Sequence, residues 1–115
     1  MLSSGVGKTL LQRRAEQRKE RRIALFDSER ANLRQALAEV LPGQTVIVFG
    51  SITGRGSFNP ASDLDIAIPE EPSHLSIFGL QAFIEERMNR RVDVVLLTRC
   101  RFRDKVLREG EAWTT

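Results

Sequence analysis

Apolar residues early in the chain recur at three- and four-residue steps, the spacing of one face of an α-helix. The positions are Ile23, Phe26, Leu33, Leu37 and Val40. A charged residue, Arg30, interrupts this stripe. The following Leu41-Pro42-Gly43 stops a helix, because proline and glycine favour helix ends over interiors. The pattern predicts a helix over residues 23–40.

Two short apolar runs after this helix have the composition of β-strands. The first is Thr45–Phe49, and the second lies within residues 62–68 and contains Asp63 and Asp65. Side chains alternate between the two faces of a strand, so the two aspartates are expected on one face. The residues expected on the other face, in a core, are Leu64, Ile66 and Ile68.

The next segment predicts a helix and a third strand. Residues 69–72 form a turn, and Ser73 or Ser76 caps the helix after it. The apolar stripe of this helix comprises Ile77, Leu80, Ile84 and Met88. The strand covers about Val92–Leu97.

The C-terminal residues predict one more helix. Thr98 caps it, Phe102 and Val106 share one of its faces, and Gly110 ends it. Trp113, beyond it, is either a lid on the core or an anchor in an interface, and we favour the interface. The element order is α-β-turn-β-α-β-α. The predicted fold class is α/β (α+β), with a three-stranded sheet backed by helices.

Candidate chemistry gathers around the first two strands. Gly50 ends an apolar strand, where the absence of a side chain permits close approach of a ligand. Ser51 adds a hydroxyl and an N–H, and a short helical turn after it presents further N–H groups to a phosphate. Two carboxylates on one strand face, Asp63 and Asp65, suit a hard cation such as Mg²⁺. A lone Asp-x-Asp is more often a solvated strand face beside a hairpin turn.

A third acid in the next apolar run favours the metal-binding interpretation. Asp93 lies within Val92–Leu97, where a carboxylate is costly unless it is paired, hydrated or bound to a cation. Two acids from one strand and one from a neighbouring strand form a cage for one or two Mg²⁺ ions.

These pieces together resemble the nucleotidyltransferase superfamily of the DNA polymerase β type. More narrowly, they resemble the minimal nucleotidyltransferase (MNT) domains that are often encoded beside HEPN-domain proteins. The resemblance spans about residues 30–113 and rests on Gly50-Ser51, Gly56, Ser62-Asp63-Leu64-Asp65 and Val92-Asp93-Val94. Eleven residues separate Gly-Ser from Asp63 where the family has ten, and the additional residue falls in the loop 53–56.

The resemblance implies a polymerase β-like fold with a small mixed sheet and transfer of AMP from Mg-ATP to a hydroxyl group. The implied metal ligands and catalytic residues are Asp63, Asp65 and Asp93. Among them, Asp93 completes the second metal site and helps to deprotonate the attacking hydroxyl. The implied nucleotide-binding residues are Gly50, Ser51, Gly56 and Ser62.

Composition and charge bound these expectations. The chain has 115 residues, which favours one domain, and a net charge of +3. Residues 1–34 hold nine Lys/Arg against four Asp/Glu, whereas residues 35–115 hold nine against eleven. We therefore expect a basic arm or helix extension over residues 1–22 and a nucleotidyltransferase domain over 23–115. Residues Leu10 to Arg22 could form a solvated helix, a disordered arm, or a partner-binding or RNA-binding extension, and we favour the solvated helix. The absence of interleaved aromatic residues leaves RNA binding as a minor option.

A single cysteine, Cys100, excludes an internal disulfide framework. With one histidine beside it, the sequence also argues against a Zn²⁺ site. No apolar run approaches the length of a membrane span and no secretory signal is recognisable, so we expect a cytoplasmic protein.

The acceptor is expected on another protein, because a chain of this length leaves no room for an acceptor-binding domain. The resemblance implies a HEPN partner, with the MNT protein acting as an antitoxin that adenylylates a HEPN ribonuclease. Two alternatives stay open: a non-catalytic antitoxin that neutralises its partner by binding alone, and a small-molecule adenylyltransferase subunit.

Overall fold

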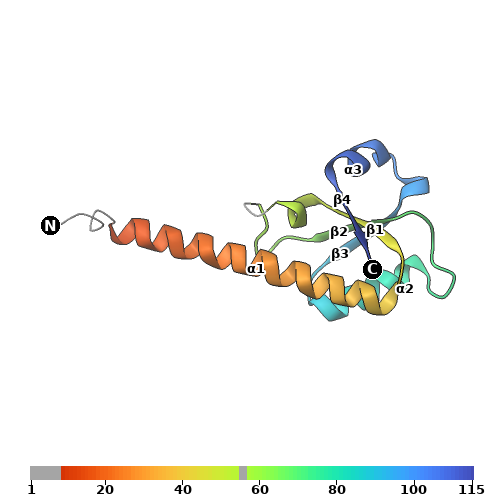
Figure 1. The fold of residues 1–115 in the computed structure, drawn as a ribbon, viewed down its shortest axis with the longest axis horizontal. Coiled ribbons are helices and arrows are strands. Elements are labelled where there is room, and N and C mark those ends of the chain that lie inside the picture. Colours follow the sequence, from red (N-terminus) through yellow and green to blue (C-terminus); the bar gives the residue numbers. More distant parts are fainter. Residues whose placement is uncertain (1–8, 55–56) are drawn as a thin grey trace.

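The first element is one continuous helix, α1 (Leu10–Val40). The computed structural model describes residues 9–54 and 57–115. Thr9 and Gln12 form a capping box at the start of α1, in which each side chain accepts the other residue's N–H. At 1.5 Å per residue the helix is about 46 Å long, and its first half projects beyond the rest of the molecule (Figure 1).

The expected solvated helix over residues 10–22 is confirmed, because these residues are helical and exposed. The helix continues through residues 22 and 23 without a break, and the division into an arm and a domain there stays a prediction. Within the described chain, no helix combines the length and apolar character that crossing a bilayer requires.

The elements after α1 include every predicted strand and helix, together with one strand more. They are β1 (Thr45–Phe49), the 3-10 turn η2 (Gly50–Thr53), β2 (Leu64–Ile68), α2 (Ile77–Met88), β3 (Val92–Leu96), the 3-10 turn η3 (Leu97–Arg99), α3 (Arg103–Glu109) and β4 (Glu111–Thr114). Of the two serines proposed as caps for α2, Ser76 takes that role and accepts the Gly79 N–H at 3.0 Å. The expectation for Thr98 was wrong: it lies in η3, and α3 begins after Phe102 without a side-chain cap.

The sheet has four strands in the order β3-β2-β1-β4, one more than the three predicted. β1 is antiparallel to β2 and β4, and β2 is parallel to β3, so the sheet is mixed as expected. The additional strand pairs Trp113 with Val46 and buries the indole to 3% exposure. The expectation that Trp113 anchors an interface was therefore wrong, because pairing along β1 places it in the core.

The two faces of the sheet are covered differently (Figure 1). One face packs against α1 and α2 in the main core. The largest fully buried side chains of this core include Leu33, Leu37, Ile52, Phe58, Leu64, Ile66, Leu80 and Ile84. The other face carries a smaller cluster in which Ile47 and Ala67 pack beneath Val106 of α3. Because α3 is short, one end of this second face is left open, and the candidate site lies there.

Replacement of Trp113 by alanine tests whether β4 is part of the core. Truncation of a buried aromatic side chain removes its contacts and leaves a cavity, so we expect Trp113→Ala to lower the free energy of unfolding by about 3 kcal/mol. The control is Phe78→Ala, which truncates a side chain that is 80% exposed and is expected to change stability by less than about 0.5 kcal/mol. Equilibrium unfolding in urea measures both values, and equal stabilities of the two variants would contradict the placement of Trp113.

Candidate active site

Two of the three predicted acids lie side by side on neighbouring strands. The parallel pairing of β2 and β3 makes Asp65 and Asp93 direct partners, and the antiparallel pairing of β1 and β2 places Phe49 opposite Asp65. Directly paired residues share a face, here the face that α3 covers in part. Asp63 is exposed and directly precedes β2. The sequence pattern predicts Asp63 and Asp65 on one face of a strand, whereas β2 begins only at Leu64 and the register partner of Asp65 is Asp93.

The carboxylate of Asp65 packs directly against Gly50. Gly50 has a φ of +76°, which side-chain-bearing residues rarely adopt, and a Cβ atom there would lie 2.4 Å from Asp65 Oδ2. Any other residue at position 50 would therefore collide with the carboxylate as well as strain the backbone. This contact places an acidic group beside the turn proposed to hold phosphate.

The predicted helical turn after β1 is confirmed as η2. The Gly54 N–H donates to Ser51 O at 3.1 Å and the Thr53 hydroxyl donates to Gly50 O at 2.7 Å, so the turn is closed by its own residues. Ser51 is half-exposed at its start. Gly50, Ser51 and Asp65 therefore meet at one end of the sheet.

The site concentrates negative charge. The pKa of Asp65 is raised, first by burial of the carboxylate and then by the charges of Asp93 and Asp63. Among the residues that the structure describes, no arginine or lysine forms an ion pair with any of these three acids. Carboxylates without an ion pair among the described residues fit a divalent cation, which would reduce the repulsion and favour the ionised form.

The three acids are not gathered into a finished cage. Within residues 9–54 and 57–115, no group of three His, Cys, Asp or Glu side chains is placed so that it could hold a metal ion. Asp65 and Asp93 supply adjacent oxygen ligands, and Asp63 lies next to them in the chain. The assignment of all three as metal ligands stays a prediction.

Comparison with known proteins identifies the family. The family model "Polymerase beta, Nucleotidyltransferase" matches residues 31–113. The chain belongs to this nucleotidyltransferase family. No curated protein matches the sequence.

Two solved structures share the fold of this nucleotidyltransferase. One is described as "Crystal structure of the toxin-antitoxin with AMP-PNP", with 23% identity and a TM-score of 0.57 over 74% of this chain and 73% of that one. The other is described as "Crystal structure the toxin-antitoxin MntA-HepT", with 21% identity and a TM-score of 0.52 over 75% and 73%. The resemblance to the nucleotidyltransferases of the polymerase β type is confirmed, as is the polymerase β-like fold.

The other two predicted nucleotide-binding residues of the nucleotidyltransferase lie in the loop between η2 and β2. Gly56 falls outside the described residues. Ser62 is half-exposed, and its hydroxyl accepts the Asn59 N–H at 3.0 Å while its own N–H donates to Asn59 O at 3.0 Å. Ser62 thus closes the turn that leads into Asp63, and its role toward a nucleotide stays a prediction.

The sequence does not identify Arg90, whose side chain hydrogen-bonds to the backbone of this loop. Its Nη1 donates to Ser62 O at 2.6 Å and to Asn59 O at 3.2 Å, and its guanidinium stacks 4.7 Å from the centre of the buried Phe58 ring. Arg90 Nε lies 3.5 Å from Glu29 Oε2, with the two side chains only 10% and 15% exposed. These atoms form an ion pair without hydrogen-bond geometry. No spacing or motif in the sequence distinguishes Arg90 from the arginine that follows it.

Arg30 holds the turn η2 of the nucleotidyltransferase by a similar hydrogen bond to its backbone. Its guanidinium binds both carboxylate oxygens of Glu111 in β4, at 2.7 and 2.8 Å, and donates to Ile52 O in η2 at 2.9 Å. The hydrogen bond to Arg30 lowers the pKa of Glu111, and the same bond raises the pKa of Arg30. The interruption of the apolar stripe at position 30 was the sequence signal for this contact.

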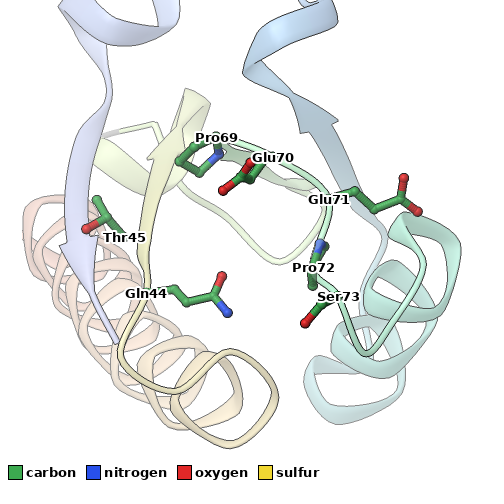
Figure 2. A pocket seen from close by; sticks show the side chains of 7 residues that line it. All are labelled: Gln44, Thr45, Pro69, Glu70, Glu71, Pro72 and Ser73. Atoms are coloured by element: carbon green, nitrogen blue, oxygen red, sulfur yellow. The ribbon is translucent and has the colours of Figure 1, made fainter.

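A hollow at the opposite end of the sheet is not part of this site. It has a volume of about 500 Å³ and lies beside the start of β1 and the loop after β2, whereas Asp65 and Gly50 lie at the end of β1 (Figure 2). Its lining residues are Gln44, Thr45, Pro69, Glu70, Glu71, Pro72 and Ser73. The only charged groups in that lining are acidic, so it does not suit phosphate.

Arg90→Met tests the loop anchor. Methionine cannot bind the two carbonyls and leaves Glu29 nearly buried without its cation, so we expect a loss of about 3 kcal/mol in the free energy of unfolding. Arg87→Met is the matched control, because Arg87 pairs with Glu39 in an exposed position, and its loss is expected to stay below about 1 kcal/mol. Urea unfolding measures the free energy of unfolding of both variants. Comparable losses would mean that the Arg90 contacts contribute no more than an exposed ion pair.

Asp65→Asn tests the electrostatic account. Because the folded-state pKa of Asp65 is raised, its charge destabilises the folded protein at neutral pH, and this cost disappears as the pH falls through the raised pKa. We therefore expect Asp65→Asn to be more stable than the wild type at pH 7, with the difference shrinking toward acid pH. Glu111 acts oppositely, since its stabilisation is lost as the pH falls through its lowered pKa, but it contributes equally to both proteins.

The same variant reports on the cation. MgCl₂ is expected to raise the melting temperature of the wild type and to leave Asp65→Asn nearly unchanged, because a ligand that binds only the folded state stabilises it. The control is Glu86→Gln, which removes an exposed acid on α2. Equal responses of all three proteins to MgCl₂ would contradict a site at Asp65.

Proposed function

We propose that this protein transfers AMP from Mg-ATP to a hydroxyl group on a HEPN-domain partner protein, and that it serves as the antitoxin of the pair. The observation that carries the proposal is the placement of Asp65 and Asp93 as register partners directly beside the Gly50-Ser51 turn. Nucleotidyl transfer needs a phosphate-binding turn and carboxylates for Mg²⁺ at one place. Membership of the nucleotidyltransferase family adds independent support.

In the proposed reaction, the oxygen of the acceptor hydroxyl attacks the α-phosphorus of ATP. The new bond joins that oxygen to phosphorus, and the proton of the hydroxyl passes to Asp93. The bond from the α-phosphorus to the bridging oxygen breaks, and pyrophosphate leaves with its electron pair. Mg²⁺ held by the aspartates would supply neutralisation of the phosphate charge.

The chain's own groups have distinct roles in this proposal. Gly50 and Ser51 hold phosphate, and Asp63 and Asp65 hold the metal. Asp93 lies beside them and is exposed, so it is accessible to the proton of an incoming hydroxyl and serves the nucleophile. The Arg30 and Arg90 anchors keep the turn and the acidic loop at a fixed separation.

The partner is inferred from structures of the same fold. One of them is a toxin–antitoxin with AMP-PNP, an ATP analogue, and the other is a toxin–antitoxin named MntA-HepT. The name HepT agrees with the HEPN partner that the sequence motifs imply. A shared fold at 21–23% identity leaves catalysis on a partner to be tested directly.

The decisive test uses trace amounts of protein. A catalyst modifies many partner molecules, so substoichiometric wild-type protein with Mg-ATP is expected to silence an excess of HEPN ribonuclease. The triple variant Asp63→Asn, Asp65→Asn, Asp93→Asn is expected to bind the partner and fail to silence it at the same ratio. Ribonuclease activity and the mass of the partner are measured, with modification appearing as one added AMP per site.

Occlusion without catalysis gives a different result, because each bound copy covers only one partner. Inhibition would then follow the molar ratio, need no nucleotide and persist in the triple variant. That outcome would defeat the enzymatic proposal and leave a binding antitoxin.

A further inference from the structure

A second hollow opens beside the phosphate turn, on the face that carries the carboxylates. It lies between the end of β1 and α3 and has a volume of about 350 Å³. Its lining residues are Phe49, Gly50, Phe102, Lys105, Val106 and Glu109. Gly50 belongs both to this hollow and to the contact with Asp65, so the hollow and the acidic site are continuous.

The lining of this hollow includes an aromatic ring that the fold does not bury. Phe102, which directly precedes α3, is 58% exposed, although Val106 in α3, four residues later, is buried at 3%. Single exposed apolar residues are common on protein surfaces. Phe102 differs in that it borders a concave, largely apolar space beside a phosphate turn, where a flat ligand can stack on it.

We propose that this hollow receives the nucleobase of the nucleotide whose phosphates lie at Gly50 and Ser51, with Phe102 as the stacking residue. The inference rests on the proposed nucleotidyl transfer and adds the part of the substrate that the motifs leave unplaced. Continuity through Gly50 selects this occupant, because a nucleotide has an aromatic base attached to its phosphates. The volume lies in the range of small-molecule sites.

The charged groups of the lining are Lys105 and Glu109, one cation and one acid. They balance each other, which suits a neutral base, and Lys105 can still pair with the negative charge of the attached phosphates. An apolar side chain of the partner protein would fill the same space without any need for Lys105 or for the neighbouring phosphate turn. Phe102 lies outside the carboxylate group, so it contributes to binding of the base and leaves binding of bare phosphates unaffected.

The test compares a ligand that has a base with one that has none. Affinities of the full-length protein for ATP and for inorganic tripolyphosphate, both with Mg²⁺, are measured by isothermal titration calorimetry. Loss of one aromatic stacking partner weakens binding about tenfold, so Phe102→Ala is expected to bind ATP about tenfold more weakly and tripolyphosphate unchanged. Phe102→Tyr, which keeps the ring, is expected to bind both as the wild type does.

Phe78→Ala is the matched control, because it removes another exposed phenylalanine, from α2, that does not line this hollow. It should leave both affinities unchanged. Circular dichroism checks that Phe102→Ala is folded. If it is not, Phe102→Leu takes its place, since leucine keeps apolar bulk but offers no flat ring, and the same selective loss is expected.

Three outcomes would overturn the base site. They are ATP affinity equal to that of the wild type, equal weakening of ATP and tripolyphosphate, and a weakened complex with the HEPN partner at unchanged ATP affinity. In each of these the wild type still binds ATP, so the proposed function survives. A wild type that binds neither ATP nor tripolyphosphate would instead overturn the proposed function together with this inference.

Discussion

Close packing of the Asp65 carboxylate against Gly50 is the constraint on which the rest of the structure depends. A single added Cβ would lie 2.4 Å from Asp65 Oδ2, so β1, η2 and β2 can meet in this way only through glycine. The contact places the Asp65 carboxylate beside the turn η2. It also partly removes this carboxylate from water, although Asp93 and Asp63 carry like charges nearby. Leu64 and Ile66 on the opposite face of β2 are fully buried, and this apolar burial offsets the cost of partly burying the carboxylate.

Two arginines hold the backbone between β1 and Asp65. Arg30 binds a carbonyl of η2, and Arg90 binds two carbonyls of the loop that leads into β2. Each arginine also meets a glutamate from another element, Glu111 in β4 or Glu29 in α1. Hydrogen bonds from an ionised group to carbonyls are stronger than neutral ones. The turn η2 and the loop before β2 are therefore tied to α1 and β4, and this fixes the backbone that leads to Asp63 and Asp65.

The sequence predicts the strands and the candidate acids well, because both follow from simple periodicity. Alternation along β2 places Leu64 and Ile66 in the core and Asp65 on the other face, as found. β4 has only four residues and one buried side chain, Trp113, so it has no alternation to detect. The interrupted stripe marks Arg30, but its partners are Glu111 in β4, 81 residues away, and the Ile52 carbonyl in η2. Local patterns do not reveal the partners in such long-range contacts, and the same is true of Arg90 and Glu29.

The incomplete clustering of the three acids follows from the same electrostatics. Three like charges held close together would repel one another in the absence of a cation. Asp63, which precedes β2, and Asp93 in β3 are instead exposed to water. Of the three acids, Asp65 is the one that is partly buried, beside Gly50, and burial raises its pKa. In the proposed function, a cation bound with the nucleotide would lower the cost of the Asp65 charge, so stability that the fold gives up at this position would reappear as free energy of binding.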